Sequence, residues 1–383
     1  MLRGFLKIAV PCLLLIAVLA AAKYRDSGRY ANRTPSDTQT PVRQETQSVE
    51  TTAAMETEPV QTEPAETEAE QTVSSQQDQT FVFTFLGDCT LGTTPAVYYA
   101  QVGFIKTIGE DYLYPFENVR TYVENDDFTL VNLEGPLTDT GNAGIGKYTF
   151  RGPEHFVNIL TMNSVEAVTL ANNHTMDYGA EGINNTRKVL DEARVSYVEK
   201  DCSKVITLES GLTVGLYATT YASYDKEDLI AEISAMKEQG VNVIIYAPHW
   251  GVEGSYRPNA EQKALAYAAI DAGANIVFGA HPHVLQPIEE YNGGVIYYSL
   301  ANFCFGGNSA PRDLDTVVLQ QEVILQPDGT VKLGERTVVP CSVSSVEGRN
   351  NYQPTPYGEN SEEYIRTMEK VSGTFEGPNL PIP

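Results

Sequence analysis

The chain has 383 residues, a formal net charge of −24 and only five histidines. Most of the negative charge follows residue 80. Such an acidic chain is not expected to bind nucleic acid, which requires a basic surface. An anionic substrate stays compatible with this charge if a bound metal supplies local positive charge.

Residues 1–22 have the pattern of an export signal. Arg3 and Lys7 precede an uncharged apolar run over residues 8–22, as the charged and apolar regions of a signal peptide do. A helix of this length spans about 22 Å, less than the ~30 Å hydrocarbon core of a membrane. Two alternatives follow: a signal anchor, or a signal peptide cleaved near 20–22. Both place the remaining chain on the extracytoplasmic side, held at the cell membrane in the first case and secreted in the second.

Residues 23–79 have the composition of a disordered spacer. Between Glu45 and Thr80 the chain has nine acidic residues and no Lys or Arg, set among Thr, Gln, Ser and Pro. Such a segment buries too little apolar surface to offset its ordering entropy, so we expect a self-repelling tether. A folded domain is expected over 80–345. A C-terminal tail is expected over 346–383, either loosely packed or helical at "SEEYIRTMEK".

Strand-like apolar runs alternate with helix-like segments in the expected domain. The runs that end in polar residues are "FVFTFLGD", "FTLVNLEG", "VEAVTLANNH", "VNVIIYAPHW" and "ANIVFGAHPH". Helical segments are "AEGINNTRKVLDEA", "KEDLIAEISAMKEQG" and "PNAEQKALAYAAIDAG", of which the second ends at Gly240, a residue type that commonly follows a helix C-terminus. The alternation predicts an α/β fold. Three later runs, beginning with "GVIYYSLANF", are expected to be antiparallel strands.

The polar residues at the ends of these runs indicate a functional site, because α/β sheets bind ligands at the carboxyl ends of their strands. The residues at those ends are Asp88, Asn132, Glu134, Asn172, Asn173, His174, His249, His281 and His283. Imidazole, carboxylate and amide oxygen together suit divalent metals such as Mn²⁺, Zn²⁺ or Fe²⁺. In "GAHPHVLQ", Pro282 restricts the backbone, so the two flanking histidines can bind one metal, or one each of two adjacent metals.

Five motifs in these segments resemble one known family. They are "FLGDCTLG", "VNLEGPLT", "LANNHTMDYG", "APHWGVE" and the long stretch 271–306. They are similar to the bacterial capsule-synthesis CapA family, also called poly-γ-glutamate biosynthesis proteins, a branch of the calcineurin-like metallophosphoesterase superfamily. The resemblance covers about residues 81–310. It implies a four-layer α/β/β/α metallophosphoesterase-like sandwich with its site at the strand ends.

The resemblance also implies roles for individual residues. Glu134 would bridge two metals; Asn173, His249 and His281 would complete the shell of one, and Asp88 and His283 would bind the other. His174 stands where the superfamily has a general acid, with Asp177 orienting it. Arg151 is a candidate for substrate contact and Asn302 for support of the ligands. The superfamily usually begins with Asp-x-His, and Thr90 stands in place of that histidine, so the first metal would have fewer protein ligands.

Two functions are compatible with this site. In the first, the protein is a phosphoesterase-like hydrolase in which one or two divalent ions activate water and polarise the scissile bond, while His174 protonates the leaving group. In the second, it is a non-catalytic accessory protein that binds an anionic polymer and has a structural or vestigial metal site. Both imply synthesis or export of a capsule polymer such as poly-γ-glutamate, with polymer synthetase and export proteins as partners. A structural wall module without metal is a third, weaker alternative.

Overall fold

The computed structural model describes residues 77–221 and 224–381. The expected export signal and nearly all of the expected spacer lie outside these residues. Within the described ranges, none of the helices combines the length and the hydropathy that a membrane crossing requires.

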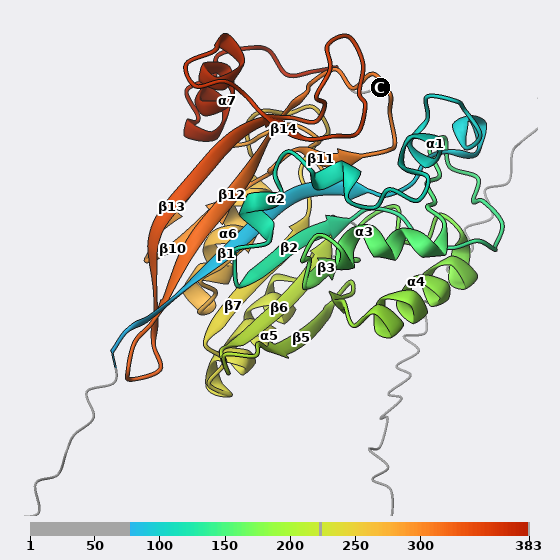
Figure 1. The fold of residues 1–383 in the computed structure, drawn as a ribbon. Coiled ribbons are helices and arrows are strands. Elements are labelled where there is room, and N and C mark those ends of the chain that lie inside the picture. The colour runs from blue at the N-terminus through green and yellow to red at the C-terminus, as the bar shows by residue number, and fades with distance from the viewer. Residues whose placement is uncertain (1–76, 222–223, 382–383) are drawn as a thin grey trace, which may run out of the picture. The chain divides into compact units, whose positions relative to one another are not determined.

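The first sheet carries half of the candidate site (Figure 1). Among the described residues it has eight strands in the order β14-β13-β12-β1-β2-β3-β4, with β11 also pairing with β1. The strands are β1 (Gln79–Thr90), β2 (Phe128–Leu133), β3 (Ala167–Thr169), β4 (Ser196–Val198), β11 (Asn302–Phe305), β12 (Asp315–Leu325), β13 (Val331–Ser342) and β14 (Thr355–Pro356). Since β1 to β4 run parallel, their carboxyl ends lie along one edge. β12 and β13 are antiparallel to their neighbours.

The second sheet carries the other half. Within the described chain it has six strands in the order β5-β6-β7-β8-β10-β9. They are β5 (Cys202–Thr207), β6 (Thr213–Thr220), β7 (Val243–His249), β8 (Ile276–Phe278), β9 (Ile288–Tyr291) and β10 (Gly294–Tyr297). β6, β7, β8 and β10 run parallel, and β5 and β9 close the two edges as antiparallel strands.

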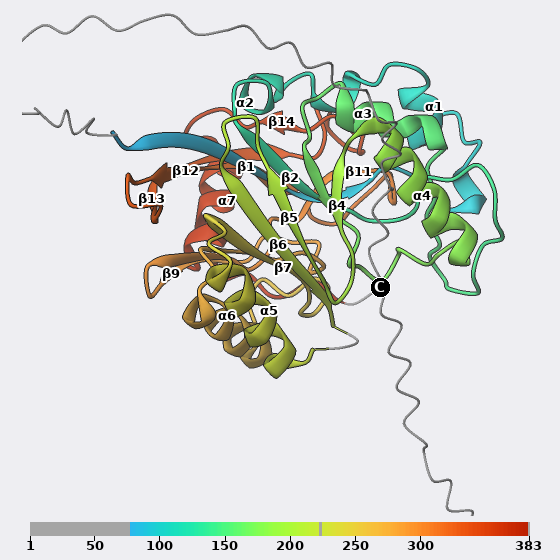
Figure 2. The same ribbon diagram turned by 90° about the horizontal axis from the view of Figure 1, so that it is seen from below.

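Helices cover the outer faces of the two sheets, as Figure 2 shows most clearly. The described helices are α1 (Phe104–Ile108), α2 (Arg120–Val123), α3 (Val157–Thr161), α4 (Gly179–Ala193), α5 (Lys226–Glu238), α6 (Ala260–Ala272) and α7 (Glu362–Ser372), with short 3₁₀ turns at Pro95–Val97, Tyr114–Phe116 and Glu154–Phe156. α1 to α4 pack against the first sheet, and α5 and α6 against the second. α5 is followed by Gly240 with φ 77°. α6 begins after an Asn259 capping box, one residue beyond Pro258.

Three hydrophobic clusters in the described residues account for the layering. The alternation of β1 sends Phe81, Phe83 and Phe85 into the cluster between the two sheets. Leu86, on the other face of the strand, and Cys89, beyond the register shift between Leu86 and Asp88, join the cluster under α1 to α4. Strands covered on both faces are apolar throughout, which explains the unbroken apolar runs in the sequence.

The structure corrects one sequence expectation and adds to others. β11, expected in an antiparallel run, is parallel to β1 and pairs Asn302 with Asp88, because the chain crosses between the sheets after β10. Strands β4 to β6 were not predicted. The described part of the expected tail, 346–381, contains helix α7 and the fully buried Asn350, so it packs on the domain.

Candidate metal centre

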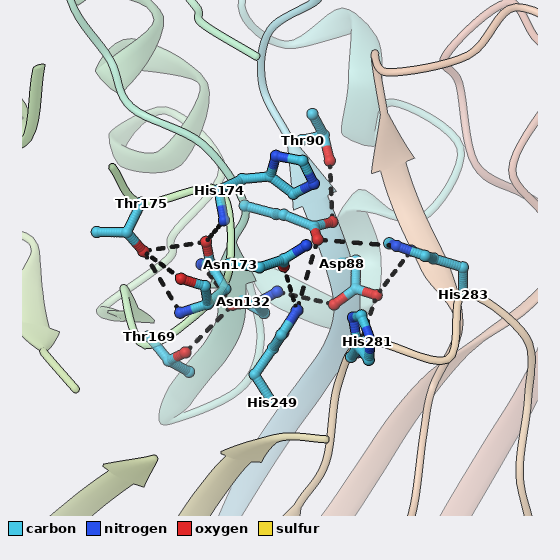
Figure 3. Close-up of polar contacts among 12 residues, drawn as sticks. Asp88, Thr90, Asn132, Thr169, Asn173, His174, Thr175, His249, His281 and His283 are labelled. Carbon is cyan, nitrogen blue, oxygen red and sulfur yellow. Dashed lines mark hydrogen bonds and ion pairs between the residues drawn. The ribbon is translucent and has the colours of Figure 1, made fainter. Parts of the chain in front are cut away.

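The predicted site residues converge where strands of both sheets end (Figure 3). From the first sheet, β1 carries Asp88 near its end and β2 is followed directly by Glu134. From the second sheet, β7 ends at His249, and the turn after β8 carries His281 and His283. The parallel direction of these strands is what brings distant parts of the sequence to one place.

Asp88 is a fully buried carboxylate held from several sides. Asn132 Nδ2 donates to its Oδ1 at 2.8 Å, and the backbone N–H of His281 donates to its Oδ2 at 3.4 Å. His283 Nδ1 lies 3.2 Å from the same Oδ2. The carboxylate is therefore fixed in direction, with His283 beside it.

Glu134, 1% exposed, lies between histidines of the second sheet. Its Oε1 is 3.6 Å from His249 Nε2 and 3.8 Å from His283 Nε2. Thr90 Oγ1 donates to its Oε2 at 3.2 Å. Thr90 thus orients the carboxylate that the sequence analysis expected to bridge two metals. Within the described residues, the buried Oε1 has no hydrogen-bond partner.

His249 connects the two halves of the site. Its Nε2–H donates to Asn173 Oδ1 at 2.7 Å, and its ring centroid lies 4.7 Å from that of His281. The Nδ1 atoms of both rings are buried and without a hydrogen-bond partner in the part of the chain described. Buried polar atoms are normally satisfied, so these nitrogens are available to an additional group.

The His281–Pro282–His283 turn has an unusual backbone. The two histidines have φ values of 99° and 55°, a region that residues other than glycine rarely occupy. His283 Nδ1–H donates to Asn302 Oδ1 at 2.9 Å, and Asn302 Nδ2 donates back to the carbonyl oxygen of His283 at 3.3 Å. Asn302 thus forms two hydrogen bonds with His283 from the first sheet.

His174 forms a dyad with Asp177. Its Nδ1–H donates to Asp177 Oδ2 at 2.7 Å, and the same oxygen accepts the backbone N–H of Phe150 at 2.6 Å. Burial lowers the pKa of His174, but the Asp177 hydrogen bond and nearby carboxylates outweigh it, so the pKa is raised. The ring packs 4.4 Å from Phe150, centroid to centroid. Nε2 remains as the atom that can exchange a proton.

Two of the three histidines of the centre are neutral at neutral pH, and the third, His283, is protonated. Burial lowers the pKa of His249 well below its usual value. Burial, with the charge of His283, lowers the pKa of His281 to about 3. Both rings are thus neutral at neutral pH, the form that binds metals. Burial opposes a charge on His283, but Glu134 and Asp88 outweigh it and raise its pKa to about 10. The carboxylates of Glu134 and Asp88 therefore strongly favour a positive charge beside them.

An open cleft of about 740 Å³ adjoins this centre. His174, His283 and Asn302 line it, together with Lys147 and Arg312. The dyad side of the centre is therefore accessible from this cleft.

Arg151, predicted to contact substrate, does not line this cleft. Its guanidinium lies 5.0 Å from the ring centroids of both Tyr98 and Tyr178. The guanidinium thus packs against these two rings, and its contact with substrate stays a prediction.

Sequence reasoning assigned no role to several residues that the structure places in or around the site. Asn132 donates to Asp88 and accepts from Thr169 and Asn172. Glu253 lies in a group with the histidines of the turn. The signal for Asn132 is its position two residues before Glu134, since alternate residues of a strand share a face. The signal that could have identified Glu253 is its position in the motif "HWGVE", four residues after His249.

The residues present fit a divalent cation. Asp88, Glu134 and His283 offer ligand atoms that all lie within 4.8 Å of one another. The buried Glu134 Oε1, which has no hydrogen-bond partner among the described residues, is an atom that such an ion would satisfy. A mixed nitrogen and oxygen set matches Mn²⁺, Zn²⁺ or Fe²⁺ and does not single out one of them.

Comparison with known proteins shows the family to which the chain is related. The family model described as bacterial capsule synthesis protein PGA_cap matches residues 82–307. The capsule biosynthesis protein CapA of Bacillus anthracis is 30% identical over 299 residues, covering 71% of this chain and 69% of that protein. The PGA biosynthesis protein CapA of Bacillus subtilis is 31% identical over 295 residues, covering 71% of this chain and 74% of that protein. A probable polyglutamine synthesis accessory protein of Mycobacterium tuberculosis is 26% identical over 223 residues, covering 49% and 58%.

Proposed function

Because the chain belongs to the bacterial capsule synthesis protein PGA_cap family, we propose that it acts on an anionic cell-envelope polymer of the poly-γ-glutamate type, as a divalent-metal-dependent hydrolase. It would work outside the cytoplasm, held at the membrane by residues 1–22, beside the proteins that synthesise and export the polymer. The observation that supports hydrolysis is the meeting of two buried carboxylates with three imidazoles next to an open cleft.

In this proposal one or two divalent ions would be held by Asp88, Glu134, Asn173, His249, His281 and His283. When bound, such an ion would lower the pKa of water and polarise the bond to be cut. His174 holds a proton on Nε2 for the leaving group, because Asp177 accepts from its Nδ1–H and keeps the ring oriented. Lys147 and Arg312 on the cleft attract the carboxylates or phosphates of the polymer.

The competing function is a non-catalytic accessory protein that binds the polymer through its metal. Thr90 favours this alternative, because a hydroxyl that donates to Glu134 replaces a ligand common in hydrolases of the superfamily. The name of the mycobacterial relative, a probable accessory protein, points the same way.

Three alanine variants of the full chain separate the two. With Mn²⁺, we would assay a generic phosphodiester and poly-γ-glutamate, and measure bound metal. We expect His249→Ala to lose metal and turnover, and His174→Ala to keep metal but lose turnover. His155→Ala is the matched control, since His155 is exposed and its Nδ1 contacts Tyr112 instead of the site. Polymer binding with bound metal and no turnover by the unmodified protein would establish the accessory function instead.

A further inference from the structure

We infer that Glu253 is an additional cation ligand of this site, acting with His281 and His283; the inference rests on the proposed metal site. One carboxylate oxygen of Glu253 and one ring nitrogen of each histidine lie within 4.8 Å of one another. Glu253 also lines the cleft. Its carboxylate makes no hydrogen bond within the described residues, so it is free to bind an ion.

His281 supplies a second, independent observation. Its side chain is in a residue only 7% exposed, and its Nδ1 has no hydrogen-bond partner among the described residues. Leaving a buried nitrogen unsatisfied costs about 1–3 kcal/mol. A cation bound at this nitrogen would remove that cost.

The backbone holds the Glu253 loop against the histidine turn. Gly254 N donates to the carbonyl oxygen of Pro282 at 2.8 Å, and Trp250 N donates to that of Ala280 at 3.0 Å. The two segments are thus bonded on both sides of Glu253. From the outside, Leu380 N donates to the carbonyl oxygen of Gly254 at 2.9 Å. A Cβ on Gly254 would lie 2.8 Å from the backbone oxygen of Leu380, so this position requires glycine.

Charge balance explains why the site uses a third carboxylate. Asp88 and Glu134 carry two negative charges, half of what two divalent ions would need. Uncompensated charge in a buried site is costly. Glu253, which follows β7 of the second sheet, adds a third negative charge to those of Asp88 and Glu134.

The test is Mn²⁺ binding to the full-length chain, measured by isothermal titration and by electron paramagnetic resonance. We expect Glu253→Gln to lose one Mn²⁺ per chain, or to bind it at least about 10-fold more weakly. Glu253→Asp, which keeps the carboxylate, should lose less. Glu261→Gln is the matched control, an exposed glutamate in the first turn of α6, and should bind as the unmodified protein does.

The outcomes separate this inference from the proposed function. Mn²⁺ affinity and stoichiometry of Glu253→Gln within twofold of the unmodified protein, while His249→Ala loses metal, would overturn the inference alone. Absence of Mn²⁺ binding by the unmodified protein would overturn both.

Discussion

Replacing Asn132 by alanine should weaken both the fold and the metal centre. Asn132 is fully buried, donates to Asp88 at 2.8 Å, and accepts from Thr169 at 3.2 Å and Asn172 at 3.1 Å. The bond to the charged carboxylate is worth about 2 kcal/mol and each neutral bond about 1 kcal/mol. We expect Asn132→Ala to lower the free energy of unfolding by about 4 kcal/mol.

Urea denaturation measures this loss, and titration with Mn²⁺ measures the effect on the site. Thr169→Ala is the matched comparison, because it removes one neutral bond and should cost about 1 kcal/mol. Freed from its donor, Asp88 should also bind metal about 10-fold to 100-fold more weakly. If Asn132→Ala costs no more than Thr169→Ala and leaves Mn²⁺ affinity unchanged, the hydrogen-bond network does not position Asp88 and our reasoning is wrong.

Two further predictions concern protons. Asp177→Asn should keep the shape of the dyad but lower the basicity of His174, so we expect turnover to fall by about 100-fold or more with Mn²⁺ affinity unchanged; a loss of metal would contradict the dyad's separate role. Glu166 accepts the Thr129 backbone N–H at 2.7 Å, and burial, with the nearby negative charge, raises its pKa from 4.5 to about 7. Because the folded-state pKa is the higher one, its stabilising contribution is complete below about pH 4.5 and is lost as the pH rises through 7. Denaturation curves between pH 4.5 and 8 should show a loss of about 2–3 kcal/mol that Glu166→Gln removes and the exposed Glu192→Gln does not.

The strands that carry the site were predictable from the sequence, because buried parallel strands leave continuous apolar runs and their polar ends stand out. Asp88, Glu134 and His249 each follow or end such a run. The pairing of strands within a sheet, in contrast, depends on hydrogen bonds between segments that lie far apart in the sequence. The parallel contact of β11 with β1 leaves no local pattern in "YSLANF".

The surroundings of individual side chains were equally unpredictable where they depend on contacts with segments far away in the sequence. Arg151 has a charge that suits an anionic substrate, but its two tyrosine neighbours come from different loops, and only the fold shows them. Glu253 is brought to the histidines by a backbone bond between Gly254 and Pro282. Neither arrangement follows from spacing along the chain.

The two ends of the described chain leave the domain at very different places. β1 runs from Gln79 to Asp88, and nine residues at ~3.3 Å each put its entry point about 30 Å from the metal ligands. Leu380, at the other end, lines the cleft itself. An attachment point at the start of β1 is therefore remote from the cleft, whereas one at Leu380 is part of its wall.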